Sequence, residues 1–586
     1  MRTCHTLIVG TGAAGYAAAD ALHRLGVSGI ALLTNGKNHG TSRNTGSDKQ
    51  TYYKPSLDGQ TPDCAAALAE EFTRGGCCDG VLAYTEAANS LRGFYRLLEL
   101  GVPFPQDAYG CFPSYLTDHD RGGRATSIGP LTSKAMVECL ERQVLEKNGT
   151  PLLDRMQVLR ILLHEGRAAG VYALDQDDNV VRVLAKNVIF ATGAPARIYA
   201  QSVYPPSQRG ATGALIEAGA PLVNFCEWQY GLASVKFRWN LSGSYLQVMP
   251  RVYSQDEGGV CHDFLGRMPM ETIFRKGAQW PFDAAKAEGT SRIDLLVQAE
   301  TAAGRCVYLD YRQNPAGYAF DALPEDIRDY FITRGAAGDT PIERLERLNP
   351  KAIDLYLGHG IDLRRAPLEA AICAQHCNGG VLVDEHGQSG VPGLYAVGEA
   401  GGVFGLTRPG GSALNDTQVG ALRAAAHIAA QAGGEPPAHV GAAEQEALTE
   451  RIAALRIDPE APPGGIPAQM SRCAAFLRDR EGMAALLRQI DGLLQEPDRP
   501  ARSVSEYFYE RDMLLSARMM LISALETMKR AGSRGGALYM ENGAVIPEDT
   551  AYRDFRAVTA GDGVTFIPLR PIPRERAIFE SLPGSR

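Results

Sequence analysis

The stretch Thr6-Leu-Ile-Val-Gly10-Thr-Gly12-Ala-Ala-Gly15 decides the fold of this chain. An apolar strand ends at a Gly-x-Gly-x-x-Gly turn, and the turn opens an Ala-rich segment, Ala13–Arg24, for which the pattern predicts a helix. The glycines permit a tight turn, close approach of a pyrophosphate and close packing of the helix on the strand. The helix N-terminus adds unpaired N–H groups. A dinucleotide-binding site is therefore predicted, in preference to a plain tight turn.

The end of the second strand departs from the usual form of this motif. An Asp or Glu is expected about twenty residues after the turn, where its carboxylate holds a ribose hydroxyl. The strand here ends Ala31-Leu-Leu-Thr34-Asn35 instead. We expect Thr34, or the backbone beside it, to hold the ribose less strongly than a carboxylate would.

The rest of the chain divides by its pattern. Its 586 residues, 45% hydrophobic and 22% charged, have the composition of a globular protein with several domains. Helical segments at 81–100 and 130–148 and a β-rich stretch at 151–191 continue an α/β alternation, which predicts a doubly wound, Rossmann-like sheet. Amphipathic segments at Glu444–Leu455, Gly482–Gln495 and Asp512–Lys529 predict a helical region. The predicted parts are a nucleotide-binding domain in two pieces, 1–225 and 356–435, an inserted α+β capping domain at 226–355, a helical domain at 436–545 and a C-terminal tail at 546–586.

Charge and cysteine content exclude several functions. The balance of 59 Lys and Arg against 67 Asp and Glu gives a net charge of −8, and no basic run occurs, so nucleic acid is not an expected partner. The 12 cysteines show no C-x-x-C or paired zinc spacing, so we predict no metal site. Cys373 and Cys377 have the spacing of ligands on a helix, but we interpret them as two small residues beside a turn.

The sequence shows no secretory leader and no uninterrupted apolar stretch of about 18 residues. Free thiols also favour a reducing compartment. We therefore predict a cytoplasmic protein without direct membrane insertion.

Glycine-rich segments far apart in the chain favour FAD over NAD. They are Phe190-Ala-Thr-Gly193, Gly210-Ala-Thr-Gly213, Tyr395-Ala-Val-Gly-Glu399 and Arg408-Pro-Gly-Gly-Ser-Ala-Leu-Asn415. An extended FAD needs such further contact regions, because its ring lies far from its adenine. We expect Glu399 to bond a ribose or ribityl hydroxyl, the alternative being a solvated turn carboxylate. The N–H groups of Ser412 to Leu414 are expected to face the flavin pyrimidine oxygen.

These segments, in this order, make the sequence resemble the flavoprotein subunit of the fumarate reductase and succinate dehydrogenase superfamily, which also includes L-aspartate oxidase. Further matching segments extend the resemblance over nearly the whole chain: Gly258-Gly259, Val307-Tyr-Leu-Asp310, His376-Cys-Asn-Gly-Gly380 and Ser533-Arg-Gly535. The resemblance implies an FAD-binding domain, a mobile cap, a C-terminal helical domain and hydride transfer between flavin N5 and a substrate carbon at the domain interface.

Three positions depart from the family's pattern at the substrate site. Gln229 stands where the family has the His of Gln-Phe-His-Pro-Thr, Gln255 replaces the Arg of Arg-Gly-Glu-Gly-Gly, and Gln375 replaces the His of His-Tyr-Thr-Met-Gly-Gly. Only Arg408 remains of the usual cations. Because glutamine keeps hydrogen-bonding capacity but carries no charge, we expect a neutral or singly charged substrate and not succinate or fumarate.

A covalent flavin linkage is not expected. Linked members of the family have a His before a Thr in the loop after the second strand, whereas Gly40-Thr41 occupies that place here and His39 lies one residue earlier. We predict noncovalent FAD and an ordinary loop role for His39. The following residues up to Gly46 are small or carry hydroxyls, which suits a pyrophosphate or the flavin, and Arg43 can reach a phosphate.

The predicted cofactor-binding residues are Gly10, Gly12, Ala13, Ala14, Gly15, Thr34, Asn35, Thr41, Ser42, Arg43, Thr45, Gly46, Ala191, Thr192, Gly193, Gly398, Glu399, Gly411, Ser412, Ala413 and Leu414.

The main hypothesis is an FAD-dependent oxidoreductase that dehydrogenates or reduces a small polar molecule beneath the cap. The candidates for its proton-transfer group are His376, Arg251 and Tyr230, in that order, and Arg408 is the expected substrate anchor. The alternative is a flavoprotein without its own substrate chemistry that serves as an electron-transfer or assembly subunit for an iron–sulfur partner. With either function, an iron–sulfur or other electron-acceptor protein is a possible partner. An enclosed pocket beside Arg408 would favour the enzyme, and an open, flat flavin edge would favour the electron carrier.

Overall fold

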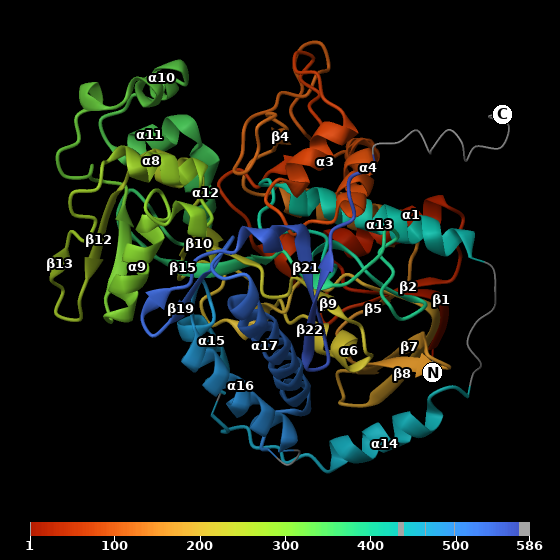
Figure 1. Ribbon diagram of the computed structural model, residues 1–586. Helices are drawn as coiled ribbons and strands as arrows, with labels where there is room; N and C mark the ends of the chain where they lie inside the picture. Colours follow the sequence, from red (N-terminus) through yellow and green to blue (C-terminus); the bar gives the residue numbers. More distant parts are fainter. Residues whose placement is uncertain (1, 432–438, 463, 497–498, 574–586) are drawn as a thin grey trace.

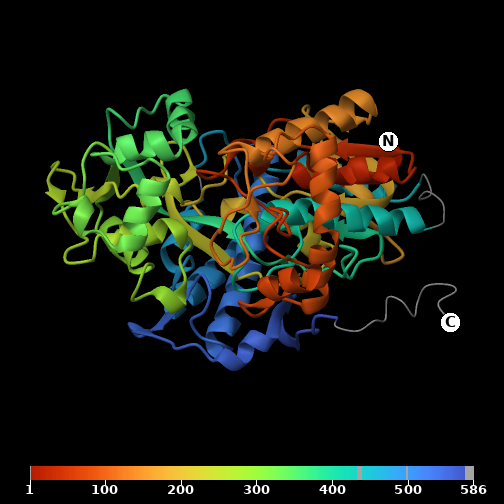
Figure 2. The same ribbon diagram turned by 90° about the horizontal axis from the view of Figure 1, so that it is seen from above.

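The computed structural model describes residues 2–431, 439–462, 464–496 and 499–573. Figure 1 shows an α/β body, a cap of helices and strands at one side of it, and a layer of helices along the bottom. Seen from above, the cap stands beside the body and the C-terminal helices cover another side (Figure 2).

The central sheet of the body carries the nucleotide-binding pattern. Its strand order is β5-β2-β1-β8-β7-β6, with β17 also paired to β8. The strands are β1 (Arg2–Val9), β2 (Ile30–Leu33), β5 (Leu152–Leu153), β6 (Gln157–His164), β7 (Arg167–Leu174), β8 (Val180–Phe190) and β17 (Leu394–Ala396). β1 pairs in parallel with β2 and β8, and β17 pairs in parallel with β8. The predicted doubly wound sheet is therefore confirmed.

Helix α1 (Ala13–Arg24) connects β1 to β2 and begins and ends where the sequence predicts. It packs against α13 (Ser412–Ala430) and α5 (Thr132–Glu141). Its alanines are almost fully buried, because small side chains let it lie close to both neighbours. Helix α4 (Gly80–Glu99) and α5 correspond to the helical segments predicted at 81–100 and 130–148.

The cap is built on a second sheet with the strand order β11-β10-β15-β14-β12-β13. Its strands are β10 (Trp228–Ser234), β11 (Trp239–Asn240), β12 (Arg251–Gln255), β13 (Cys261–His262), β14 (Cys306–Asp310) and β15 (Leu368–Cys377). The helices that accompany it are α7 (Ser244–Gln247), α8 (Glu271–Ala278), α9 (Arg292–Ala302), α10 (Glu325–Thr333), α11 (Pro341–Leu348) and α12 (Pro350–Gly358).

Strand β15 corrects two sequence-based interpretations. It pairs with β10 and β14, so the cap sheet continues past residue 355, where the capping domain was predicted to end. The sequence shows no sign of this, because the apolar pattern of β15 does not reveal that the strand pairs with β10 and β14 of the cap. Cys373 and Cys377 are buried on this strand and are therefore neither helical ligands nor turn residues.

The C-terminal part is helical, as predicted. It contains α14 (Ala442–Ala453), α15 (Ile466–Cys473), α16 (Arg480–Gln495) and α17 (Val504–Arg530). Helix α17 begins eight residues before the predicted Asp512, because Ser503 caps it by accepting a hydrogen bond from the Glu506 N–H. The tail adds β21 (Phe555–Ala560) and β22 (Gly563–Pro568), and β21 pairs with β9 (Leu222–Val223). The predicted boundary at 435–436 and the last part of the tail, 574–586, lie outside the described residues.

Within the described ranges, no helix combines the length and the apolar character that a membrane crossing would need.

Candidate functional site

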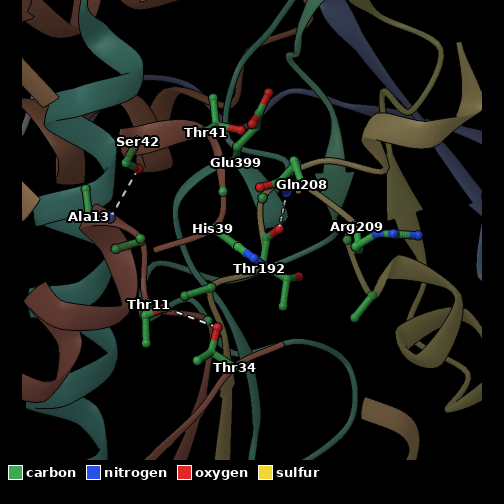
Figure 3. Close-up of a pocket in the computed structure, with 18 of the residues that line it drawn as sticks. Thr11, Ala13, Thr34, His39, Thr41, Ser42, Thr192, Gln208, Arg209 and Glu399 are labelled. Atoms are coloured by element: carbon green, nitrogen blue, oxygen red, sulfur yellow. Dashed lines mark hydrogen bonds between the residues drawn. The ribbon is translucent and has the colours of Figure 1, made fainter. Parts of the chain in front are cut away.

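The turn after β1 lines a long cavity, which we call the glycine-turn cavity. Six segments contribute most of its wall: 9–14, 33–36, 39–42, 191–193, 207–211 and 413–414. Figure 3 shows Ser42, Thr192, Arg209 and Glu399, which come from distant parts of the chain, around one common space. The end of β8, the end of β2 and the start of α13 meet here because the carboxyl ends of parallel strands share one sheet edge, where α/β proteins bind ligands.

The three glycines of the turn have three different roles. Gly10 has φ +110°, and a Cβ on it would lie 2.4 Å from the Ala191 carbonyl oxygen. A Cβ on Gly15 would lie 2.0 Å from the Gly10 oxygen, so this glycine allows α1 to pack on β1. A Cβ on Gly12 would meet only Ser42 Oγ, at 3.3 Å, and would otherwise project into the cavity. The absence of a side chain at Gly12 therefore leaves space for a ligand, whereas at Gly10 and Gly15 it leaves space for neighbouring backbone atoms.

Several buried polar atoms of the cavity wall have no protein partner. Within the described residues these are Thr41 Oγ1, Thr192 Oγ1, both polar atoms of the Gln375 amide, and His376 Nε2. The N-cap of helix α1 is Gly12, which has no side chain to accept from the helix N-terminus, and among the residues that the structure describes only the Ala13 N–H is bonded by a side chain, Ser42 Oγ at 3.2 Å. An unsatisfied buried polar group costs about 1–3 kcal/mol, so these atoms fit a large polar ligand along the whole cavity. An extended dinucleotide, with its pyrophosphate at the start of α1, satisfies this requirement.

The polar side chains at the end of β2 already have hydrogen-bond partners within the protein. Thr34 Oγ1 accepts a hydrogen bond from Thr11 Oγ1 at 3.1 Å, so the threonine hydroxyl is already engaged. Asn35 donates to the Tyr509 hydroxyl at 3.0 Å, and the Arg209 guanidinium lies 4.6 Å from the Tyr509 ring centre. Tyr509 belongs to α17, so the helical domain forms part of the cavity wall.

A second cavity, the cap cavity, adjoins the first. Its wall comes from residues 45–51 and 115–118, from cap residues including Gln229, Asn240 and Trp280, and from the turn that holds Arg408. Thr45, Gln50, Ala413 and Leu414 line both cavities. The two spaces therefore meet at the start of α13.

Three side chains connect the two cavities, of which His376 is buried and Glu399 and Arg408 are partly buried. Arg408 Nε donates to His376 Nδ1 at 3.4 Å, and His376 Nε2 lies 3.7 Å from Glu399 Oε1. Glu399 also accepts hydrogen bonds from the Tyr204 hydroxyl and from the Cys377 N–H. Burial raises the pKa of Glu399 to about 7. Burial, together with the nearby Arg408 charge, lowers the pKa of His376 well below its usual value, so this imidazole is neutral.

Most of the predicted cofactor residues line one of the two cavities. Those in the glycine-turn cavity are Gly10, Gly12, Ala13, Ala14, Thr34, Asn35, Thr41, Ser42, Thr45, Ala191, Thr192, Gly193, Glu399, Ala413 and Leu414. Gly46 and Gly411 line the cap cavity. The Glu399 side chain is only 14% exposed, so its alternative interpretation as a solvated turn carboxylate does not agree with the structure.

Four predicted cofactor residues lie behind the wall instead. Arg43 is paired with Glu141, which explains why it does not reach the cavity. Gly15 packs on Gly10, and a Cβ on Gly398 would lie 3.0 Å from the Ala14 side chain. Ser412 is buried in the first turn of α13. These positions shape the wall through packing.

The predicted substrate residues separate into two groups. Gln229 and Arg408 line the cap cavity, and Gln375 and His376 line the glycine-turn cavity. Arg251, Gln255 and Tyr230 line neither, so their predicted catalytic roles do not agree with the structure.

These three corrections have simple geometric causes. Arg251 and Gln255 lie on β12, which is three strands away from β10, about 14 Å at ordinary strand spacing. There Arg251 pairs with Asp263, and Gln255 donates to the Gly259 carbonyl. Tyr230 is on β10 but points to the opposite side, where its hydroxyl bonds Tyr199 at 2.9 Å.

Sequence reasoning missed several wall residues. Gln208 and Arg209 directly precede the quoted Gly210-Ala-Thr-Gly213, so that segment gave a local signal. Tyr509 gave none, because it comes from a helix about three hundred residues away in the chain. Asp48, Asp118 and Trp280 of the cap cavity were also missed. His39, predicted as an ordinary loop residue, lines the glycine-turn cavity and projects into it in Figure 3.

In the described part of the chain, no group of three or more His, Cys, Asp or Glu side chains could hold a metal ion.

The fold and these cavities define a flavoprotein of the doubly wound type. The FAD binding domain family matches residues 5–414, which is more than half of the chain, and the chain belongs to this family. It is 25% identical over 465 residues to a fumarate reductase (CoM/CoB) component of Methanothermobacter marburgensis, covering 76% of this chain and 78% of that protein. It is 24% identical over 554 residues to L-aspartate oxidase of Mycobacterium tuberculosis, covering 92% and 93%.

The fold is also that of E. coli quinol fumarate reductase FrdA, with a TM-score of 0.73, 19% identity, and coverage of 100% of this chain and 99% of that one. The resemblance stated from the sequence is confirmed. The cofactor is FAD, and the chain is an FAD-dependent oxidoreductase of the fumarate reductase, succinate dehydrogenase and L-aspartate oxidase type.

Proposed function

We propose that this enzyme transfers a hydride between its FAD and a small polar substrate in the cap cavity, and that the substrate is neither succinate nor fumarate. The observation that carries the proposal is the charge of the cap cavity. Its cations are Arg408 and Lys49, and its carboxyl groups are those of Asp48 and Asp118. Burial raises the pKa of Asp48, so two cations against these two carboxyl groups leave at most one net positive charge. An enclosed dianion with so little compensating charge is strongly disfavoured.

The remaining polar groups of the cap cavity are neutral. Gln229 is 6% exposed and lines the cavity, and Asn240 Oδ1 is buried without a partner among the described residues. Trp280 and Tyr115 add aromatic surface. This combination suits a neutral or singly charged molecule with one group for Arg408 and further groups for neutral hydrogen bonds.

FAD supplies the hydride acceptor or donor at flavin N5 when bound. The residues that line the glycine-turn cavity would hold it, with Gly12 and the start of α1 at the pyrophosphate and Ala413 and Leu414 at the ring. Cap residues such as Trp280 line the space beside Arg408, and exclusion of water from it on substrate binding would strengthen the electrostatic contacts made there.

We propose that Glu399, which lines the glycine-turn cavity and not the cap cavity, exchanges its proton with the substrate site through His376 and Arg408, the two side chains that lie between it and the cap cavity. Its pKa of about 7 gives it both protonation states near neutral pH. Neutral His376 lies between Glu399 and Arg408, with its Nδ1 3.4 Å from Arg408 Nε and 3.2 Å from Asn378 Oδ1. This differs from the sequence-based hypothesis, in which His376 itself was the first candidate, because burial lowers the pKa of the imidazole too far.

The position of Arg408 in the cap cavity favours the enzyme over the alternative of an electron-transfer component. Arg408 lines a cavity covered by cap residues and not an open flavin edge. An iron–sulfur or other electron-acceptor protein as the physiological partner stays a prediction. The relative from Methanothermobacter marburgensis is named as one of the subunits of its fumarate reductase, which supports a search for such a partner by affinity purification. A cytoplasmic location and a noncovalent FAD also stay predictions.

The test is an anaerobic stopped-flow panel on the purified holoenzyme. We expect no reduction of the oxidised flavin by succinate or L-aspartate and no reoxidation of the reduced flavin by fumarate, whereas some neutral or monoanionic compounds react. Rates of about 1 s⁻¹ or faster with succinate or fumarate, in the usual range of turnover, would contradict the proposal.

Gln229→His provides a matched gain-of-function variant. It adds a titratable cation to the cap cavity without changing the turn that holds Arg408. If charge decides the substrate class, this variant should bind dicarboxylates more tightly than the wild type, and the difference should be larger at pH 6 than at pH 8, as measured by perturbation of the flavin absorption spectrum. Equal binding by both proteins would count against the charge argument.

A further inference from the structure

The pairing of β10 with β15 contains a β-bulge at the junction of the two cavities. Gln229 lies opposite His376 and Tyr230 lies opposite Ala374, so Gln375 has no residue opposite it. In a regular strand, consecutive side chains point to opposite faces. Here Gln375 and His376 both line the glycine-turn cavity. The bulge has turned the Gln375 side chain toward that cavity.

The Gln375 carboxamide is buried but unsatisfied. The residue is 8% exposed, and neither Oε1 nor Nε2 has a hydrogen-bond partner among the described residues. It is held in this position by packing: a Cβ on Gly231 would lie 3.2 Å from Gln375 Nε2 and 3.1 Å from the Trp280 ring. Gly231 therefore leaves space for both side chains at once. A buried amide with two free polar atoms needs a ligand that offers both a donor and an acceptor.

The position of Gln375 identifies that ligand group. The glycine turn lies at the pyrophosphate part of the cavity, whereas Ala413 and Leu414, which line both cavities, mark the part next to the substrate. The flavin ring must reach this part for a hydride to pass between the ring and a molecule in the cap cavity. The ring carries carbonyl oxygens, ring nitrogens and an N–H, so its polar edge matches a carboxamide.

We infer that Gln375 hydrogen-bonds the flavin ring and raises its reduction potential, and that it does not bind the substrate, as its alignment with a substrate-binding His had suggested. The inference rests on the proposed placement of the ring beside the cap cavity. A neutral donor favours the electron-richer reduced ring without fixing a full charge there. Gln375 thus acts as a positioning residue for the cofactor, and Gln229, in the cap cavity, remains the substrate-facing glutamine.

The test is a spectroscopic redox titration of purified holoenzyme, with wild type, Gln375→Leu and Gln229→Leu compared. Loss of the hydrogen bond in Gln375→Leu should shift the equilibrium toward the oxidised flavin by about tenfold, which is about 30 mV for a two-electron couple. The matched control Gln229→Leu, at an equally buried glutamine on the neighbouring strand, should leave the potential unchanged. FAD content and melting temperature are measured for each protein.

Gln375→Glu makes the test independent of how well the leucine variant folds. A carboxylate at this position should disfavour the reduced ring more strongly than leucine, so the potential should fall by more than that of Gln375→Leu. An unchanged potential in the glutamate variant would overturn the inference, as would an equal fall in Gln229→Leu. Failure of the proposed function would look different: it would show as turnover of succinate or fumarate by the wild type, whatever the potentials are.

Discussion

Arg408→Lys tests the substrate anchor most directly. The Arg408 guanidinium carries five N–H donors, and its bonds within the protein are weak: one to His376 Nδ1 and one to the Pro409 carbonyl, both at 3.4 Å. No carboxylate of the described residues forms an ion pair with it. The guanidinium therefore retains donors for a ligand, and its replacement should affect ligand binding more than stability.

The expected effect on turnover is much larger. A carboxylate or developing enolate held by two charge-assisted hydrogen bonds loses on the order of 2–4 kcal/mol when the planar fork is removed, or about 30–1000-fold in kcat/KM. Lysine keeps the positive charge but not the fork, so we expect Arg408→Lys near the lower limit and Arg408→Ala near the upper limit. Because the lysine variant still has a cation in the cavity, comparison of the two variants separates the effect of charge from the effect of the planar guanidinium.

The assay compares flavin content, melting temperature and kcat/KM on whichever substrate the stopped-flow panel identifies. Full FAD occupancy with an unchanged melting temperature and strongly reduced turnover supports the anchor role. Unchanged turnover in both variants would remove Arg408 from the substrate site. Loss of FAD in both would instead make it a support of the α13 turn.

The other predictions use contrasts that the structure supplies. Gly12→Val should abolish FAD loading but leave the cofactor-free protein as stable as the wild type, because a Cβ there meets only Ser42 Oγ. Gly15→Ala should instead lower the melting temperature, because its Cβ would lie 2.0 Å from the Gly10 oxygen. Flavin absorbance measures the first effect and thermal unfolding followed by circular dichroism measures the second. Because burial raises the pKa of Glu399 from 4.5 to about 7, the cofactor-free protein should lose on the order of 3 kcal/mol of stability from this group as the pH rises from 4.5 through 7. Glu399→Gln should remove that part of the pH dependence in urea unfolding, and identical pH profiles would refute the assignment. Asp48 accepts hydrogen bonds from the Ser244 N–H at 2.8 Å and the Ser244 hydroxyl at 2.9 Å and so joins the cap to the loop between the two cavities. Asp48→Ala should therefore destabilise the protein by about 2–3 kcal/mol, and Asp48→Asn, which keeps an acceptor, by less. Equal losses of stability in the two variants would show that the acceptor is unimportant.

Local patterns in the sequence were sufficient for the nucleotide-binding half of the protein. The glycine turn and α1 could be predicted residue by residue, because tight turns, helix starts and buried strands each depend on neighbours within a few positions. The uncharged glutamine at position 229 of the cap cavity is likewise visible in the chain itself.

The direction in which a side chain points, and how deeply it is buried, could not be predicted from local patterns. Tyr230 and Gln229 are adjacent in sequence, yet one points into the protein interior and the other lines the cap cavity. Arg251 and Gln255 stand in a motif of the family, but the order of strands in the cap sheet carries them away from the cavity. Side-chain direction in a sheet depends on register and on bulges, and these are set by pairing between segments far apart in the chain.

The sequence by itself determined the class of the protein: an FAD-dependent oxidoreductase with a Rossmann-like sheet, a cap and a helical part, because each of these leaves a local or periodic signature. Only the tertiary structure decided which side chains share a cavity. It placed Tyr509 beside Asn35, brought Glu399, His376 and Arg408 together, and with one extra residue in β15 turned Gln375 toward the glycine-turn cavity. The physical reason is that burial and hydrogen bonding, which fix the pKa of Glu399 and leave the Gln375 amide unsatisfied, arise from contacts between residues that lie far apart in sequence.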